Sequence, residues 1–176
     1  AQATLVGHSQ GVLVALETAS RHPERVAALT LIAGAMAIPV NDALIEMSQS
    51  APEKAFRMMT SWGHGPGAHK FDNTQPGHAF LGYGRRVMAQ NDGAALHADL
   101  VACNSYDGGK DAAASVTQPS LCLLAGKDKM TPVKFGRKMA EQISGAQCHV
   151  FERAGHFLPA EFPIEVNDAM AAFLSR

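Results

Sequence analysis

The chain has 176 residues, of which 47% are hydrophobic and 18% are charged, and its formal net charge is −1. This length and balance are typical of one ordinary globular domain. The charge gives no electrostatic attraction to nucleic acid, and no apolar run approaches the roughly 18 residues of a membrane-spanning helix. We therefore expect neither a nucleic-acid partner nor a membrane partner.

Strand and helix patterns alternate in the two terminal parts of the chain. Short apolar runs bounded by glycine or proline predict buried strands, and apolar residues at helical spacing predict helices between them. We expect strands at 3–7, 26–33, 120–125 and 147–152, and helices at 10–22, 132–143 and 160–174. This alternation predicts an α/β fold with a mostly parallel sheet and helices on both faces.

The middle of the chain, residues 36–116, has a different character, because it is rich in methionine and interrupted by glycine. We expect helices at 42–49, 52–61, 82–91 and 93–105, around a loose stretch at 63–78 whose Gly63–Gly67 segment is a flexible loop. The block is interpreted as a helical cap or lid inserted between two parts of one core, residues 1–35 and residues 117–176.

The most informative motif is Gly7-His8-Ser9-Gln10-Gly11, between the first strand and the first helix. G-x-S-x-G in this position is the nucleophile elbow, a strained turn that presents its serine at the carboxyl edge of a sheet. We expect glycine at 7 and 11 to avoid collisions with the neighbouring strand and helix. The helix dipole and the backbone N–H of Gln10 would then favour an oxyanion beside Ser9.

Two further residues complete a catalytic triad. Asp128 lies in the turn after the strand at 120–125, and His156 lies in the turn after the strand at 147–152. Parallel strands end at one side, so both turns project from the same edge as Ser9. We expect Ser9 to attack, His156 to act as general base and then acid, and Asp128 to orient the imidazole.

Three stretches carry a family resemblance: LVGHSQGVLVALETASRHPERVAALTLIAGA, PSLCLLAGKDKMTP and AGHFLPAEFP. They resemble the α/β-hydrolase fold family, especially its cap-bearing branch of esterase-like and carbon–carbon bond hydrolases. The resemblance implies that Asp128 and His156 hold the acid and histidine positions, and that residues 36–116 form the variable cap. The family also places several strands and an HG-type oxyanion loop before its elbow. Because the elbow comes here at Ser9, we expect a C-terminal portion of a longer hydrolase, with the N-terminal strands missing.

The expected function is therefore a serine hydrolase that forms an acyl-enzyme with a small-molecule acyl substrate. The bond cleaved is an ester, a lactone, a thioester or a carbon–carbon bond beside a ketone, and no cofactor or metal is needed. Candidate substrate-binding residues are His8, Trp62 and Met130. Two alternatives remain: a truncated inactive fragment, and a non-hydrolytic binder or lyase on the same fold.

The cysteines and methionines carry weaker signals. Cys103, Cys122 and Cys148 are an odd number without a C-x-x-C pair, which favours free thiols and a cytoplasmic protein. Because the chain begins with Ala1, a processed front end would have removed any signal peptide. The methionines of the middle block are either an adaptable substrate wall or plain helix packing.

Overall fold

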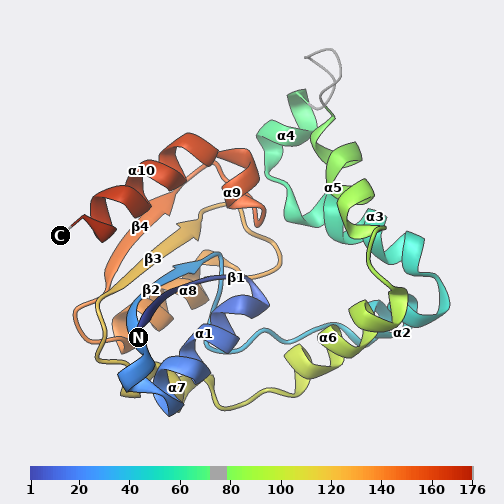
Figure 1. Cartoon of the computed structure of the whole chain (residues 1–176). Helices are drawn as coiled ribbons and strands as arrows, with labels where there is room; N and C mark the ends of the chain where they lie inside the picture. The colour runs from blue at the N-terminus through green and yellow to red at the C-terminus, as the bar shows by residue number, and fades with distance from the viewer. Residues whose placement is uncertain (72–78, 176) are drawn as a thin grey trace.

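A computed structural model describes residues 1–71 and 79–175 of the chain (Figure 1). Within these residues, four strands form one parallel sheet in the order β1-β2-β3-β4. The strands are β1 (Ala3–His8), β2 (Val26–Ile32), β3 (Ser120–Ala125) and β4 (Gln147–Phe151). The predicted strands and the predicted parallel α/β fold are confirmed, with boundary differences of one residue.

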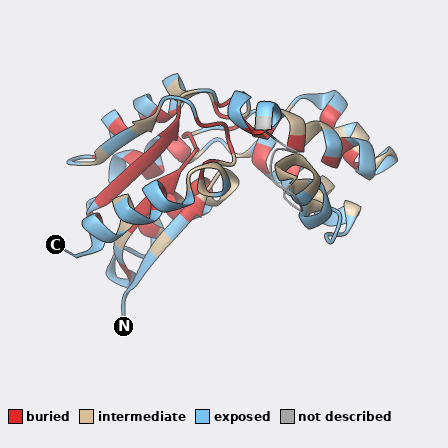
Figure 2. Cartoon of the chain, turned by 90° about the horizontal axis from the view of Figure 1, so that it is seen from above, coloured by how far each residue is buried: buried red, intermediate tan, exposed pale blue. Residues whose placement is uncertain are grey.

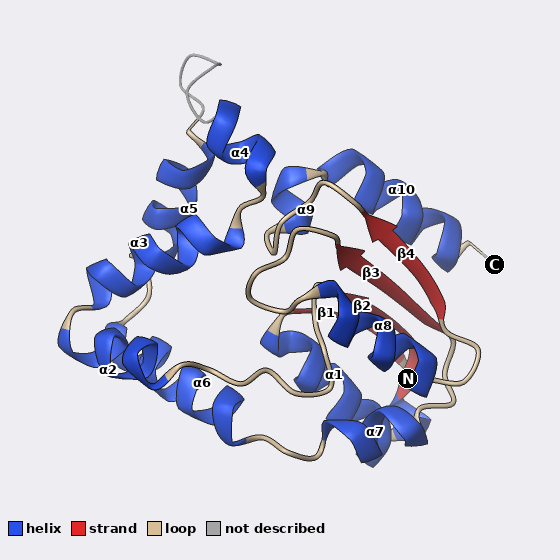
Figure 3. Cartoon of the chain, turned by 180° about the vertical axis from the view of Figure 1, so that it is seen from behind, coloured by secondary structure: helices blue, strands red, loops and turns tan. Residues whose placement is uncertain are grey.

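Helices cover both faces of this sheet (Figure 3). One face packs against α1 (Gln10–Arg21), α7 (Gly109–Ser115) and α8 (Val133–Gln142), and the other against α9 (Leu158–Glu161) and α10 (Pro163–Leu174). A short 3-10 helix, Pro23–Arg25, leads from α1 into β2. The predicted helix at 160–174 is divided, because α9 ends at Glu161 and α10 begins at Pro163, where proline favours a new first turn.

The most buried strand, β3, shows how the sheet supplies both cores. Its side chains alternate in direction, as a strand requires. Cys122 and Leu124 face the cluster that α1, α7 and α8 cover, whereas Leu121 and Leu123 face the cluster that α9 and α10 cover. Figure 2 shows the result, with buried residues gathered in the sheet, mainly on β2 and β3, and exposed residues on the outer faces of the helices. A continuous apolar run was therefore the correct signal for a strand buried on both sides.

The remaining helices lie beside the sheet (Figure 1). They are α2 (Asp42–Ser50), α3 (Pro52–Gly63), α4 (Pro66–Phe71), α5 (Phe80–Met88) and α6 (Gly93–Ser105). Four of them were predicted, and α4 was not, because it is only one to two turns long. Leu44 of α2, Ala55 of α3 and Leu100 of α6 form a small core between these three helices, and Met47, Met58 and Met59 pack against it. These three methionines therefore serve helix packing.

One helix of the predicted insertion packs with the sheet instead. Ala112 and Ala113 of α7, together with Val116, are buried in the same cluster as Val12 and Leu16 of α1. This packing differs from that expected for a block in which all of residues 36–116 stand apart from the core. The three-part division of the chain remains a prediction.

Two other findings concern the helices and the cysteines of the described residues. No helix among residues 1–71 and 79–175 is both long and apolar enough to cross a bilayer. All three cysteines are free, as predicted, with Cys103 and Cys122 buried and Cys148 exposed.

The two glycines of the G-x-S-x-G motif differ in their surroundings. A Cβ atom on Gly7 would overlap the backbone carbonyl of Gly11, 2.6 Å from its carbon. A Cβ atom on Gly11 would meet nothing within 4 Å among the described residues. The predicted reason for glycine is thus correct at position 7 and wrong at position 11, where the added atom would have open space among the described residues.

This difference yields a paired test of the turn. We expect Gly7→Ala to lower the free energy of unfolding by about 1–3 kcal/mol, because neighbouring backbone must move. Gly11→Ala should instead leave it unchanged or raise it by up to about 0.5–1 kcal/mol, because alanine has the higher helix propensity and Gly11 is the second residue of α1. Urea unfolding followed by circular dichroism measures both. Equal destabilisation by the two variants would contradict the packing described here.

Candidate active site

Ser9 occupies a strained turn at the carboxyl end of β1. β1 ends at His8 and α1 begins at Gln10, so Ser9 is the single residue between them, with φ 56° and ψ −121°. Its backbone N–H donates to the carbonyl oxygen of Ile32, 3.0 Å away at the end of β2. Ala33, with φ 44°, is the only other non-glycine residue at positive φ in the described chain. Such strain persists where surrounding contacts enforce it, and it concentrates at functional sites.

Asp128 and His156 form a buried hydrogen-bonded pair at the same edge. Asp128 lies in the turn after β3 and His156 in the turn after β4. The Nδ1–H of His156 donates to Oδ2 of Asp128 at 2.8 Å, and the two side chains are 2% and 0% exposed. With Nδ1 bearing the proton, Nε2 of the neutral ring keeps its lone pair, which is the arrangement of a general base.

The Asp128 carboxylate has further donors around it. Its Oδ1 accepts the backbone N–H groups of Met130 and Thr131, each at 2.8 Å. The Thr131 hydroxyl lies 2.8 Å from Oδ2 of Asp128 and 2.8 Å from the carbonyl oxygen of Ala33. Thr131 thereby links the aspartate turn to the end of β2. Thr131 was not among the predicted site residues, although the D-x-x-T spacing is a recognisable side-chain-capped turn.

His8 joins the serine turn to the histidine loop. Its Nε2–H donates to the carbonyl oxygen of His156 at 2.7 Å, and the two ring centroids are 4.9 Å apart. Burial is the main cause that lowers the pKa of His8, and the neighbouring His156 lowers it further. The hydrogen bond of His8 thus links the serine turn to the loop that carries His156.

The oxyanion donor predicted at Gln10 is available. In the described chain, the backbone N–H of Gln10 has no hydrogen-bond acceptor, as expected at the first position of a helix. The side chain of Gln10, the first residue of α1, donates to the carbonyl oxygen of Asp99 in α6 at 3.0 Å. The Ser9 hydroxyl likewise makes no hydrogen bond within residues 1–71 and 79–175, so the structure joins Asp128 to His156 and not His156 to Ser9.

The other predicted site residues lie further out. Trp62 is on α3 with 41% of its surface exposed. Met130 is half-buried and touches Asp128 through its backbone N–H. Substrate binding by either residue remains a prediction. Among the described residues, no group of three or more histidine, cysteine or acidic side chains is arranged to hold a metal ion.

A parallel sheet with a strained serine turn and a buried aspartate–histidine pair at one edge defines a protein of the α/β-hydrolase fold. A model of the alpha/beta hydrolase family matches residues 1–169, and the chain belongs to this family.

Similar proteins agree with this placement. The chain is 28% identical over 170 residues to a pimeloyl-[acyl-carrier protein] methyl ester esterase of Neisseria meningitidis, covering 89% of this chain and 62% of that one. The enol-lactonase of Burkholderia xenovorans superimposes with a TM-score of 0.90 at 19% identity, over 100% of this chain and 66% of that one. An esterase of Exiguobacterium antarcticum superimposes with a TM-score of 0.86 at 20% identity, over 98% of this chain and 66% of that one. The chain thus spans somewhat less than two thirds of these relatives' length.

The environment of His8 predicts how stability depends on pH. A histidine whose pKa is lowered by folding binds fewer protons in the folded state than in the unfolded state. Stability therefore rises with pH between the lowered folded pKa and the ordinary value of 6.5, and is lost as pH falls through that window. Replacing His8 with glutamine, which keeps an N–H donor at similar reach, should remove this contribution.

Urea unfolding at about pH 7.5 and about pH 5.5 tests this, because the first pH lies above the ordinary histidine pKa of 6.5 and the second lies below it. We expect the wild-type chain to lose more stability on acidification than His8→Gln does. The same loss in both proteins would show that His8 is not the residue responsible.

Proposed function

We propose that this chain carries the nucleophile, base and acid of a serine hydrolase that cleaves a carboxylic ester or a related acyl bond. Ser9 is the nucleophile, His156 the general base and Asp128 the residue that orients the imidazole. The observation that supports this most is the buried hydrogen bond from His156 to Asp128, in a loop that His8 ties to the turn of Ser9. The esterase and lactonase relatives favour an ester or lactone among acyl substrates.

The proposed reaction has two halves. In the first, Ser9 Oγ attacks the substrate carbonyl carbon while His156 Nε2 takes the hydroxyl proton. The carbonyl oxygen gains negative charge opposite the free N–H of Gln10. When this tetrahedral species collapses, the alcohol leaves with the proton from His156, and an acyl group remains on Ser9.

In the second half, a water molecule attacks the acyl carbonyl carbon and gives its proton to His156. Collapse of the second tetrahedral species releases the carboxylic acid and returns the proton to Ser9 Oγ. Throughout, Asp128 accepts the Nδ1–H of His156, which fixes the tautomer and favours the transient imidazolium. The buried position of this pair keeps the ring from rotating away between the two halves.

A fluorophosphonate probe tests the proposal directly, because it phosphonylates a serine whose proton a neighbouring base removes, with release of fluoride. We expect Ser9-dependent labelling of the folded chain and none for Ser9→Ala. Asp128→Asn should slow labelling by roughly 10⁴-fold, since the amide stabilises the wrong imidazole tautomer. Labelled peptides identified by mass spectrometry locate the modified residue.

Ser50→Ala is the matched control, because Ser50 is exposed on α2 and its hydroxyl only donates within its own helix. It should be labelled at the wild-type rate. A folded wild-type chain that resists the probe would contradict the proposal and favour an inactive fragment or a binder.

A further inference from the structure

The segment between α3 and α4 lies directly against the loop that carries His156. The backbone N–H of Phe157 donates to the carbonyl oxygen of Gly63 at 3.0 Å. A Cβ atom on Gly155 would lie 2.6 Å from the carbonyl carbon of His64 and 2.7 Å from the oxygen of Gly63. A Cβ atom on Gly65 would lie 2.7 Å from the backbone nitrogen of Gly155. The two backbones therefore touch where neither has a side chain.

This contact corrects the expectation of a flexible loop at Gly63–Gly67. Gly63, His64 and Gly65 are buried, and the ring of His64 lies 4.8 Å from the ring of Phe157. The glycines permit close approach of two backbones and are not a sign of mobility. The partner segment is some 90 residues away along the chain, so the local sequence pattern does not reveal this contact.

One carboxylate bridges the two segments. Oε2 of Glu161 accepts the backbone N–H of Gly65 at 2.9 Å, and Oε1 accepts the N–H of Gly155, next to His156, at 3.0 Å. Glu161 is the last residue of α9, the short helix that follows the histidine loop. Hydrogen bonds to an ionised acceptor are about twice as strong as those between neutral groups, so both hydrogen bonds are strong when Glu161 is charged.

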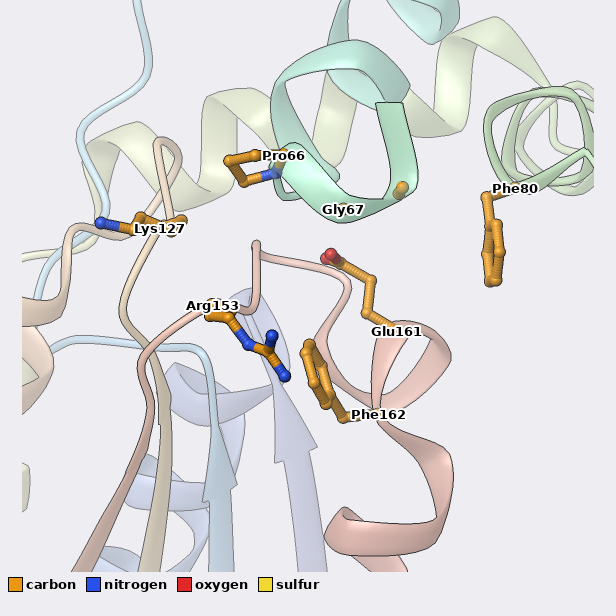
Figure 4. Close-up of a pocket in the computed structure, with 8 residues that line it drawn as sticks. Pro66, Gly67, Phe80, Lys127, Arg153, Glu161 and Phe162 are labelled. Carbon is orange, nitrogen blue, oxygen red and sulfur yellow. The ribbon is translucent and has the colours of Figure 1, made fainter. Parts of the chain in front are cut away.

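The surroundings of Glu161 are mixed in charge. It lines a cavity of about 430 Å³ together with Lys127 and Arg153, and Figure 4 shows its carboxylate beside Gly67 of α4. Burial is the main cause that raises the pKa of Glu161, Asp128 adds to that direction, and His69 opposes it. Glu161 is partly buried, and each of its carboxylate oxygens accepts one backbone N–H group. This arrangement indicates that the position needs a side chain with two acceptor oxygens.

We propose that Glu161 is a positioning residue that fixes the His156 loop against the α3–α4 segment and thereby sets the orientation of the base. The inference rests on the proposed function, since it concerns the same histidine. Glu161 itself touches no reacting atom. It acts on His156 through the hydrogen bond to the preceding residue, Gly155, while the hydrogen bond from Gly65 holds the carboxylate against the α3–α4 segment.

Replacing Glu161 with glutamine is the informative change. The amide keeps the size of the side chain but has one acceptor oxygen, so one of the two backbone N–H groups faces an NH2 group and loses its bond. Glu165→Gln is the matched control, because Glu165 is exposed on the next helix, α10.

We expect Glu161→Gln to lower the limiting rate of fluorophosphonate labelling at saturating probe by about 10- to 100-fold, because small misplacements of a catalytic group have effects of this size. The probe concentration that gives half this rate should change by less than about twofold, since probe contacts are not altered. Glu165→Gln should match the wild-type chain in both. Rates are compared below the unfolding transition of every variant.

Gly65→Ala provides a second route if Glu161→Gln does not fold, because its methyl group would lie 2.8 Å from Oε2 of Glu161 and push the bridge apart from the opposite side. We expect the same loss of limiting rate, and a double variant no slower than the slower single variant. Wild-type labelling rates in folded Glu161→Gln or Gly65→Ala would overturn the inference alone. A wild-type chain that is not labelled would instead overturn the proposed function on which it rests.

Discussion

The buried hydrogen bond between Asp128 and His156 ties together the carboxyl ends of all four strands. Asp128 follows β3 and His156 follows β4, so the bond itself joins two strand ends. Thr131 extends it to β2 through the carbonyl of Ala33, and His8 extends it to β1 through the carbonyl of His156. Burial of the pair strengthens each of these bonds, because little water competes for them. The edge of the sheet is therefore held as one unit, on which the strained turn of Ser9 depends.

Local patterns were enough to predict most of this architecture. Continuous apolar runs located the strands, and the motif around Ser9 identified the strand–turn–helix unit. The order of chemistry-bearing residues then placed Asp128 and His156 at one edge, because parallel strands must end together. These inferences succeeded because each depends on a few neighbouring residues or on topology alone. The pairing of Asp128 with His156 follows from that topology with no knowledge of side-chain contacts.

What the sequence left hidden involves contacts between distant segments. The approach of Gly65 to Gly155 and the bridge of Glu161 join residues about 90 apart, which no local pattern reveals. The open surroundings of Gly11 and the packing of Ala113 against α1 depend likewise on neighbours from elsewhere in the chain. Glycine in particular is ambiguous in a sequence, because mobility and close backbone approach call for the same residue.

A crystal structure of the chain after reaction with a fluorophosphonate would test the convergence of the three side chains most directly. We expect phosphorus bonded to Ser9 Oγ, His156 Nε2 within about 3.2 Å of that oxygen, and the hydrogen bond from Nδ1 to Asp128 retained. A phosphonylated Ser9 whose oxygen is too distant from the imidazole for a hydrogen bond, direct or through one water, would contradict it.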